Sequence, residues 1–162
     1  MPENDGLGVT WIGVPAFEPF DTAGWKAGTT GVGYERGSGY EALIGTDMDT
    51  EMRSNNSVYI RIPFTVADPG AFDRLELRMQ WDDGFVAFLN GTLLTSDNAP
   101  SQVAWNSAAL NANNEASAGS FDVYDVSNRL GALVAGQNIL AIQGLNQGTG
   151  SSDMIILSLI HI

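Results

Sequence analysis

The sequence predicts an all-β fold in which two antiparallel sheets pack together as a β-sandwich or jelly roll. Three observations lead to this prediction: several short runs alternate apolar with polar residues, turn signals separate the runs, and the 162 residues include 19 glycines. Alternation with a period of two is typical of strands that bury one face. Because no helical pattern intervenes between the runs, two packed antiparallel sheets are expected. We find no repeat or boundary and expect one domain over residues 1–162.

The clearest region runs from Leu75 to Leu94. Apolar and polar residues alternate up to Trp81, which indicates a strand with one buried face. Asp82-Asp83-Gly84 then breaks the pattern, since short carboxylates bond to nearby backbone N–H groups and glycine accepts a positive φ. A second apolar run ends at Asn90-Gly91, the strongest short hairpin signal. We therefore expect a meander of three antiparallel strands here.

The other elements are expected on both sides of this region. The run 57–66 has its apolar residues on one face and Pro63 on the other, which favours an edge strand or a bulge at this position, because proline has no N–H to donate. Residues 138–145 are apolar on both faces, as in a central strand. Helical turns are expected at 127–134. Three shorter runs predict further strands: 9–12, 121–126 and 154–160. Two segments predict loops, one rich in glycine and one polar: 25–40 and 96–120.

Charge and composition exclude several kinds of partner. The formal net charge is −12, with 19 acidic residues against 7 Lys and Arg. A phosphate backbone or an anionic membrane needs clustered cations, so we expect neither nucleic acid nor a membrane as partner. The excess of acidic residues is more compatible with a neutral ligand or a bound cation than with an anionic partner. The start of the chain lacks the pattern of a signal peptide, and no apolar run has transmembrane length.

The residue types available for catalysis are few. The chain has no cysteine, and His161 is its only histidine, one residue from the end of the sequence. Cysteine nucleophiles and ordinary zinc sites are therefore excluded. Asp82 and Asp83 are adjacent, so in an extended chain their side chains would point to opposite faces and not act as a glycosidase pair. We expect no catalytic activity, with Asp83 fixing the turn and Asp82 reaching solvent or a ligand.

A sugar-binding site requires fewer specialised residues than a catalytic site. It needs an aromatic ring under the apolar face of the sugar, and amides or carboxylates around the sugar hydroxyls. The expected strand directions gather such residues at one end of the sheet: Asp82, Asp83, Asp97, Asn98, Trp105 and Asn106. Trp105 is either the sugar platform or a buried anchor of its loop. Tyr34 and Tyr40 are second candidates, with the alternative that they pack under their own glycine-rich loop.

Several segments together carry a family resemblance: GTTGVGYE, YEALIGTDM, NNSVYIRIPFTV, WDDGFVAFLNG, DNAPSQVAWNSAA, AGQNILAIQGLN and SSDMIIL. They resemble a galactose-binding-like jelly roll, similar to the non-catalytic carbohydrate-binding modules of bacterial secreted carbohydrate-active enzymes. The resemblance implies a module that targets a tethered catalytic domain to a neutral polysaccharide or oligosaccharide, outside the cell or at its surface. The alternative within the same family is a structural or adhesive spacer with a protein partner and no sugar site.

Calcium is the one cofactor that the sequence suggests. Acidic residues stand two apart in the segment 43–52, a density of oxygen ligands similar to that of a calcium loop, although the EF-hand pattern is not met. The family resemblance favours one structural calcium, and its candidate ligands are Asp47, Asp49 and Asp153. The alternative is a short helical turn whose carboxylates face solvent.

Overall fold

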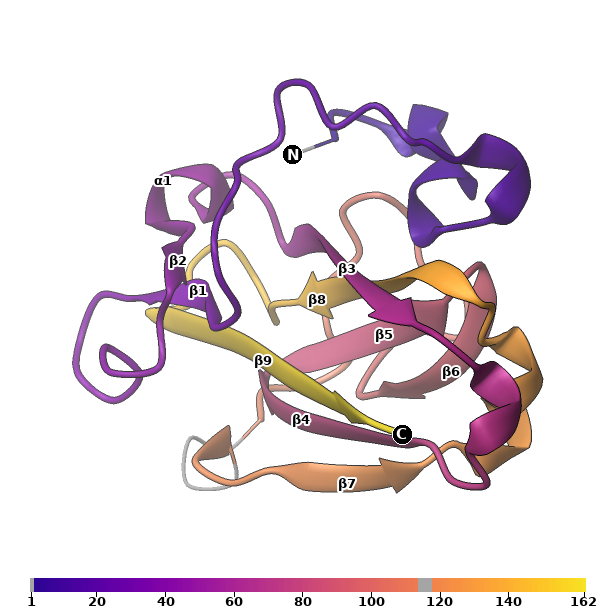
Figure 1. Cartoon of the computed structure of the whole chain (residues 1–162). Helices are drawn as coiled ribbons and strands as arrows, with labels where there is room; N and C mark the ends of the chain where they lie inside the picture. Colours follow the sequence, from indigo (N-terminus) through magenta and orange to yellow (C-terminus); the bar gives the residue numbers. More distant parts are fainter. Residues whose placement is uncertain (1, 114–117) are drawn as a thin grey trace.

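This computed structural model describes residues 2–113 and 118–162, in which nine strands form two sheets. One sheet has the strand order β2-β1-β9-β4-β7 and the other the order β3-β8-β5-β6. The two sheets form the layers of a β-sandwich (Figure 1), as the alternating sequence pattern predicts. Neighbouring strands are antiparallel, except that β1 runs parallel to β2.

The elements have the following bounds. The five-stranded sheet contains β1 (Val32–Glu35), β2 (Thr46–Asp47), β4 (Glu76–Asp82), β7 (Asp122–Asp125) and β9 (Asp153–His161). The four-stranded sheet contains β3 (Ser57–Val66), β5 (Gly84–Leu89), β6 (Thr92–Asp97) and β8 (Gly136–Leu145). The helical segments are short: α1 (Asp49–Met52) and the 3-10 helices η1 (Asp5–Leu7), η2 (Thr10–Ile12), η3 (Pro15–Phe17), η4 (Pro69–Ala71) and η5 (Ser127–Ala132). Among the described residues, no helix has the length and apolar character needed to cross a membrane.

The core lies between the two sheets, where the apolar residues of each alternating strand meet. Leu77 and Met79 of β4 and Met154 of β9 face Phe85 of β5 and Ile142 of β8, and all five are fully buried. At about 25 cal/mol per Å² of apolar surface, this burial is the main term that stabilises the sandwich. It also explains why the period-two pattern locates the strands, since each strand has one face in this core.

Several predicted elements are confirmed. Residues 57–66 form β3, which lies at the edge of its sheet, as expected for a strand that contains Pro63. Strand β8 is central, between β3 and β5. The Asn90-Gly91 turn joins β5 to β6, with φ angles of 49° and 86°. These elements depend mainly on local sequence, which is why the sequence predicts them correctly.

The predicted three-stranded meander is wrong. Strand β4 pairs with β9 and β7 in one sheet, whereas β5 pairs with β6 and β8 in the other. Asp82-Asp83-Gly84 therefore carries the chain from one layer of the sandwich to the other. The residues of β5 are buried on both faces, apart from the half-buried Phe88. Phe85, Ala87 and Leu89 belong to the core between the sheets, and Phe88 on the other face packs against the cluster around Trp11.

The glycine-rich segment 25–40 contains a strand where the sequence predicts a loop. Strand β1 pairs with β9, and a Cβ on Gly33 would lie 2.0 Å from the Met154 carbonyl oxygen. The glycine thus marks a close approach between two backbones. The glycine density is typical of a loop, but the tertiary contact with β9 decides the conformation.

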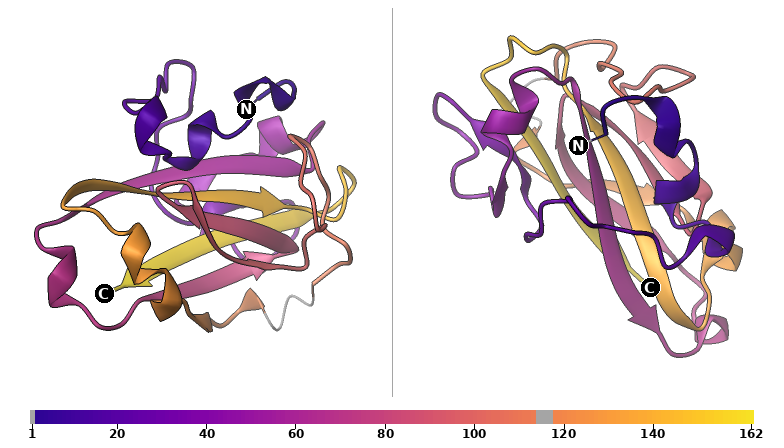
Figure 2. Two further views of the ribbon diagram at one scale, coloured as in Figure 1. Left: turned by 90° about the vertical axis from the view of Figure 1, so that its right-hand side faces the viewer. Right: turned by 90° about the horizontal axis from the view of Figure 1, so that it is seen from above.

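The N-terminal segment, residues 2–31, covers the outside of the four-stranded sheet (Figures 1 and 2). Trp11 and Ile12 pack on Ile139 and Ala141 of β8 in a second apolar cluster. The strand predicted at 9–12 is therefore wrong, because this stretch forms the 3-10 helix η2, although Trp11 is buried as expected. The segment adds a third, irregular layer to that side of the sandwich.

Candidate functional site

Asp83 organises the loops at the end of the sandwich where β5 begins. Its carboxylate accepts the backbone N–H of Asn113 and that of Gln147, each at 2.7 Å. Its carbonyl oxygen accepts from the side-chain amide of Asn98, also at 2.7 Å. Asp83 thus holds the β6–β7 loop and the β8–β9 loop to the turn after β4, in line with the turn-fixing role expected for it.

Asp82 is buried with only 2% of its surface exposed, so it reaches neither solvent nor a ligand. Its Oδ2 accepts the hydroxyl of Tyr40 at 2.8 Å, and its carboxyl group is hydrogen-bonded to that of Asp83. Burial, followed by the bond to Asp83 and that neighbour's charge, raises the pKa of Asp82 to about 8. The expectation that the two side chains point to opposite faces is therefore wrong, because they meet inside the protein.

Tyr34 and Tyr40 do not present their rings to a ligand. Tyr34 is fully buried, and its hydroxyl accepts from Asn146 at 2.7 Å and donates to the Ser151 carbonyl at 3.1 Å. Burial raises the pKa of the Tyr34 phenol. Tyr40 is buried as the partner of Asp82. Both tyrosines are structural and are not the sugar platforms that the sequence suggests.

Three further predicted residues also use their side chains in the fold. The Asp97 carboxylate accepts the Tyr124 hydroxyl at 2.9 Å. The side-chain amide of Asn98 donates to the Asp83 and Asn111 carbonyls. The Asn106 side-chain oxygen accepts the Asn56 backbone N–H at 2.7 Å. The predicted gathering at one end does bring Asp82, Asp83 and Asn98 together, but as a structural network.

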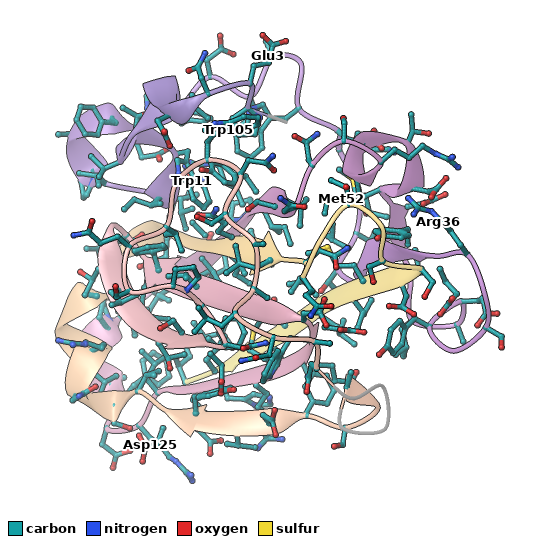
Figure 3. The ribbon with its side chains drawn as sticks, turned by 180° about the vertical axis from the view of Figure 1, so that it is seen from behind. Glu3, Trp11, Arg36, Met52, Trp105 and Asp125 are labelled. Atoms are coloured by element: carbon teal, nitrogen blue, oxygen red, sulfur yellow. The ribbon has the colours of Figure 1, made fainter. Side chains whose placement is uncertain are left out.

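Trp105 has a different environment from these residues. It is half-buried and lines a groove of about 970 Å³. The groove runs between the N-terminal segment and the edge strand β3, and α1 also lines it. Figure 3 shows Trp105 on the side of the molecule that the N-terminal segment covers, together with Trp11. The volume of the groove is near the upper end of the range for small-molecule sites, about 300–1,000 Å³, so it has room for more than one sugar ring.

Three aromatic side chains line this groove, each from a different part of the chain: Trp25, Tyr59 and Trp105. Trp25 lies edge-to-face with Phe20 at 5.5 Å, and Tyr59 stacks on Trp11 at 4.1 Å. The backbone N–H of Trp105 donates to Asp5 Oδ1 at 2.7 Å. Each aromatic residue is thus held by a contact from the N-terminal segment. The ring contacts of Trp25 and Tyr59 reduce the conformational entropy that these two side chains lose when a ligand binds.

The polar lining of the groove offers both donors and acceptors. Lys26 bridges to β2 and α1, since its Nζ donates to the Asp47 carbonyl at 2.5 Å and lies 3.1 Å from Glu51 Oε1. Arg61 is paired with Glu18 at 2.7 Å. Burial raises the pKa of the Tyr59 phenol to about 12, so its hydroxyl remains a donor at neutral pH. Because both basic residues that line the groove are paired with acids, the groove suits a neutral ligand better than an anionic one.

Sequence reasoning missed Trp25 and Tyr59. Tyr59 stands on the face of β3 opposite its core residues, on the same face as Arg61 and Pro63. The sequence does contain a signal that could have identified Tyr59, because it is an aromatic residue on the outer face of a predicted edge strand. Trp25 stands out in the sequence only as the start of a glycine-rich loop. No local pattern links it to the other two, since the N-terminal segment brings them together.

The candidate calcium ligands have other partners in the fold. The Asp49 carboxylate is paired with Arg36 and with Arg53, and these arginines lower the pKa of Asp49. The Asp153 carboxylate accepts hydroxyls from Ser151 and Ser152. In residues 2–113 and 118–162, no group of three or more His, Cys, Asp or Glu is placed to hold a metal ion. Two guanidinium groups beside Asp49 repel a divalent cation, so Asp47, Asp49 and Asp153 do not fit a calcium site. Residues 49–52 form the short helix α1 that was the alternative.

Calcium binding through oxygen atoms other than those of Asp47, Asp49 and Asp153 remains a prediction, and a thermal unfolding experiment tests it. Because a ligand that binds only the native state stabilises it, saturating calcium raises the melting temperature of a protein with a structural site by several degrees. For Asp49→Asn, we expect the same response to calcium and EDTA as in the wild type. A calcium-dependent gain that disappears in Asp49→Asn would contradict our assignment of Asp49 to arginine pairing.

Comparisons with known proteins add little to this geometry. Neither the protein-family models nor the curated protein sequences give a match to this chain. Among solved structures, an alpha-L-rhamnosidase from Dictyoglumus thermophilum is similar at 15% identity and a TM-score of 0.42. The similarity covers 86% of this chain but only 15% of the rhamnosidase chain.

Proposed function

We propose that this chain is a non-catalytic carbohydrate-binding module whose site is the groove beside β3. The observation that carries the proposal is the convergence of Trp25, Tyr59 and Trp105, from three distant parts of the chain, on one groove of about 970 Å³. Aromatic faces pack on the C–H surfaces of sugars, and the polar lining supplies partners for sugar hydroxyls. The ligand is a neutral polysaccharide or oligosaccharide, in keeping with the paired cations of the groove and the net charge of −12.

The proposal includes the absence of catalysis and a place within a larger secreted protein. The buried Asp82–Asp83 pair is enclosed by its loops, and Glu51 in the groove is paired with Lys26. Both observations favour binding over bond cleavage. A module of this kind raises the local concentration of a tethered catalytic domain at its polysaccharide, which requires only weak intrinsic affinity. We expect the isolated chain to release no product from any polysaccharide that it binds.

The variants Trp25→Ala and Trp105→Ala test the groove. Because aromatic residues at the centre of binding sites commonly contribute about 2 kcal/mol or more, we expect each variant to weaken binding roughly 30-fold. The measurement is calorimetric titration, after a screen of xylan, mannan, β-glucan and galactan oligosaccharides has identified a ligand.

Phe17→Ala is the matched control, since Phe17 is an exposed aromatic residue of the same N-terminal segment that does not line the groove. It should bind as the wild type does. A folded wild-type protein that binds no glycan in the screen would contradict the proposal. So would a Trp105→Ala variant that binds normally but melts far below the wild type, because that result would identify Trp105 as a loop anchor.

One observation favours the alternative, a structural or adhesive module with a protein partner. The register of the five-stranded sheet places Arg78 of β4 beside Leu159 of β9 and Val123 of β7. Val123 and Leu159 are exposed, which leaves two apolar side chains on either side of Arg78 on the outer face of that sheet. In this alternative, Val123→Asp would abolish association with the partner, whereas the groove variants would not affect it.

A further inference from the structure

The Asp82–Asp83 pair joins more segments than any other polar cluster described above, and the proposed sugar site does not use it. Tyr40 reaches it from the β1–β2 loop, Asn113 from the β6–β7 loop and Gln147 from the β8–β9 loop. The two aspartates themselves lie where the chain passes from one sheet to the other. The pair is therefore the common attachment point of three loops at one end of the sandwich.

The hydrogen bonds assign the protons within the pair. Asp83 accepts two backbone N–H groups at 2.7 Å, one on each carboxylate oxygen, so both of its oxygens already act as acceptors. Asp82 accepts the Tyr40 hydroxyl on one oxygen and is hydrogen-bonded to Asp83. Because a hydrogen bond between two carboxyl groups needs a proton, Asp82 is the member that carries it.

Two carboxylates and one hydroxyl act on Asp82 from the surrounding elements. They are Asp83 in the turn, Tyr40 in the β1–β2 loop and Asp153 at the start of β9. Glu35 at the end of β1 accepts the backbone N–H of Tyr40 at 3.2 Å. The Tyr40 hydroxyl donates to Asp82 and by itself favours the ionised form, whereas burial and the Asp83 and Asp153 carboxylates oppose it. Within the described part of the chain, no cation is among the groups that shift the pKa of Asp82, so a second negative charge in the pair is disfavoured on balance.

We propose that the Asp82–Asp83 pair is a pH-operated latch that holds the three loops together while it carries one proton and releases them when that proton is lost. This inference does not depend on the proposed sugar site. In the open state, Asp82 is solvated and ionises near the ordinary value of about 3.9, whereas in the closed state its pKa is raised to about 8. The closed state therefore holds one proton more than the open state between these values, and a rise in pH favours opening.

Hydrogen–deuterium exchange of the Asn113 and Gln147 amides, followed by NMR from pH 5 to pH 9, tests the latch. After correction for the intrinsic exchange rate, we expect the opening constant of both amides to rise up to about tenfold per pH unit towards pH 8 and then to level off. A flat profile for these amides in the wild-type protein would overturn the proposal.

Asp82→Asn is the decisive variant. Its amide retains a donor for Asp83 and an acceptor for the Tyr40 hydroxyl but has no proton to lose. The pH dependence of both amides should disappear in this variant, and a slope that survives would overturn the latch. Asp97→Asn is the control, since Asp97 also accepts a tyrosine hydroxyl but lies outside the pair, and its pH profile should match the wild type.

A second measurement needs no variant, in case Asp82→Asn fails to fold. Infrared spectroscopy of the wild-type protein detects a protonated carboxyl group through its C=O stretching band. We expect such a band at pH 6.5, where solvated Asp and Glu side chains are ionised, and its loss on titration to pH 10. Absence of the band at pH 6.5 would also overturn the proposal.

Discussion

Asp83→Ala should lower the free energy of unfolding by about 3–5 kcal/mol, measured by urea denaturation at pH 7. The substitution removes the charged acceptor of two part-buried N–H groups, those of Asn113 and Gln147, and a hydrogen bond to a charged group contributes about 1.5–3 kcal/mol. It also removes the partner of the Asp82 carboxyl inside the protein. The loss is large because one buried side chain, with 5% of its surface exposed, serves two loops.

The exposed Asp73 provides the control for this prediction. Asp73→Ala removes the same carboxylate from the surface and should change the free energy of unfolding by less than about 0.5 kcal/mol. A loss below about 1 kcal/mol for Asp83→Ala would mean that the remaining contacts of the β6–β7 and β8–β9 loops hold them without Asp83.

Gly31→Ala should destabilise the protein by about 3–5 kcal/mol or prevent folding. Gly31 has a φ of +82°, which an alanine adopts only with about 1–2 kcal/mol of strain. A Cβ at this position would lie 1.9 Å from the Leu43 carbonyl oxygen, so the backbone must also move. The Gly31 carbonyl accepts the N–H groups of Gly45 and Thr46, and that movement disturbs the start of β2. Thermal unfolding followed by circular dichroism measures the effect.

Gly24 separates the two contributions, because it has the same φ of +82° but a Cβ added there would meet no atom within 4 Å. Gly24→Ala should therefore show only the conformational strain of about 1–2 kcal/mol. Equal losses for the two variants would show that the contact between Gly31 and Leu43 relaxes without effect on stability.

The candidate site contains one residue that the sequence predicts, Trp105, but not the companions that the sequence predicts for it. The sequence predicts Trp105 as a sugar platform or a loop anchor, and the structure places it in a groove. Its expected companions Asp97, Asn98 and Asn106 belong instead to hydrogen-bond networks of the loops. An amide near a tryptophan in the sequence does not reveal whether it faces a ligand or a backbone N–H, because this choice depends on loops that meet only in the folded chain.

Local sequence is enough to predict the β-sandwich, the edge position of β3, the central position of β8 and the Asn90-Gly91 hairpin. These features follow from side-chain alternation, the missing N–H of proline and the φ preferences of single residues, which act over a few positions. Tertiary contacts, by contrast, place β4 and β5 in different sheets and Gly33 in a strand. They also place Trp25, Tyr59 and Trp105 in one groove, since the positions of these side chains depend on contacts between residues far apart in the chain, which no local pattern encodes.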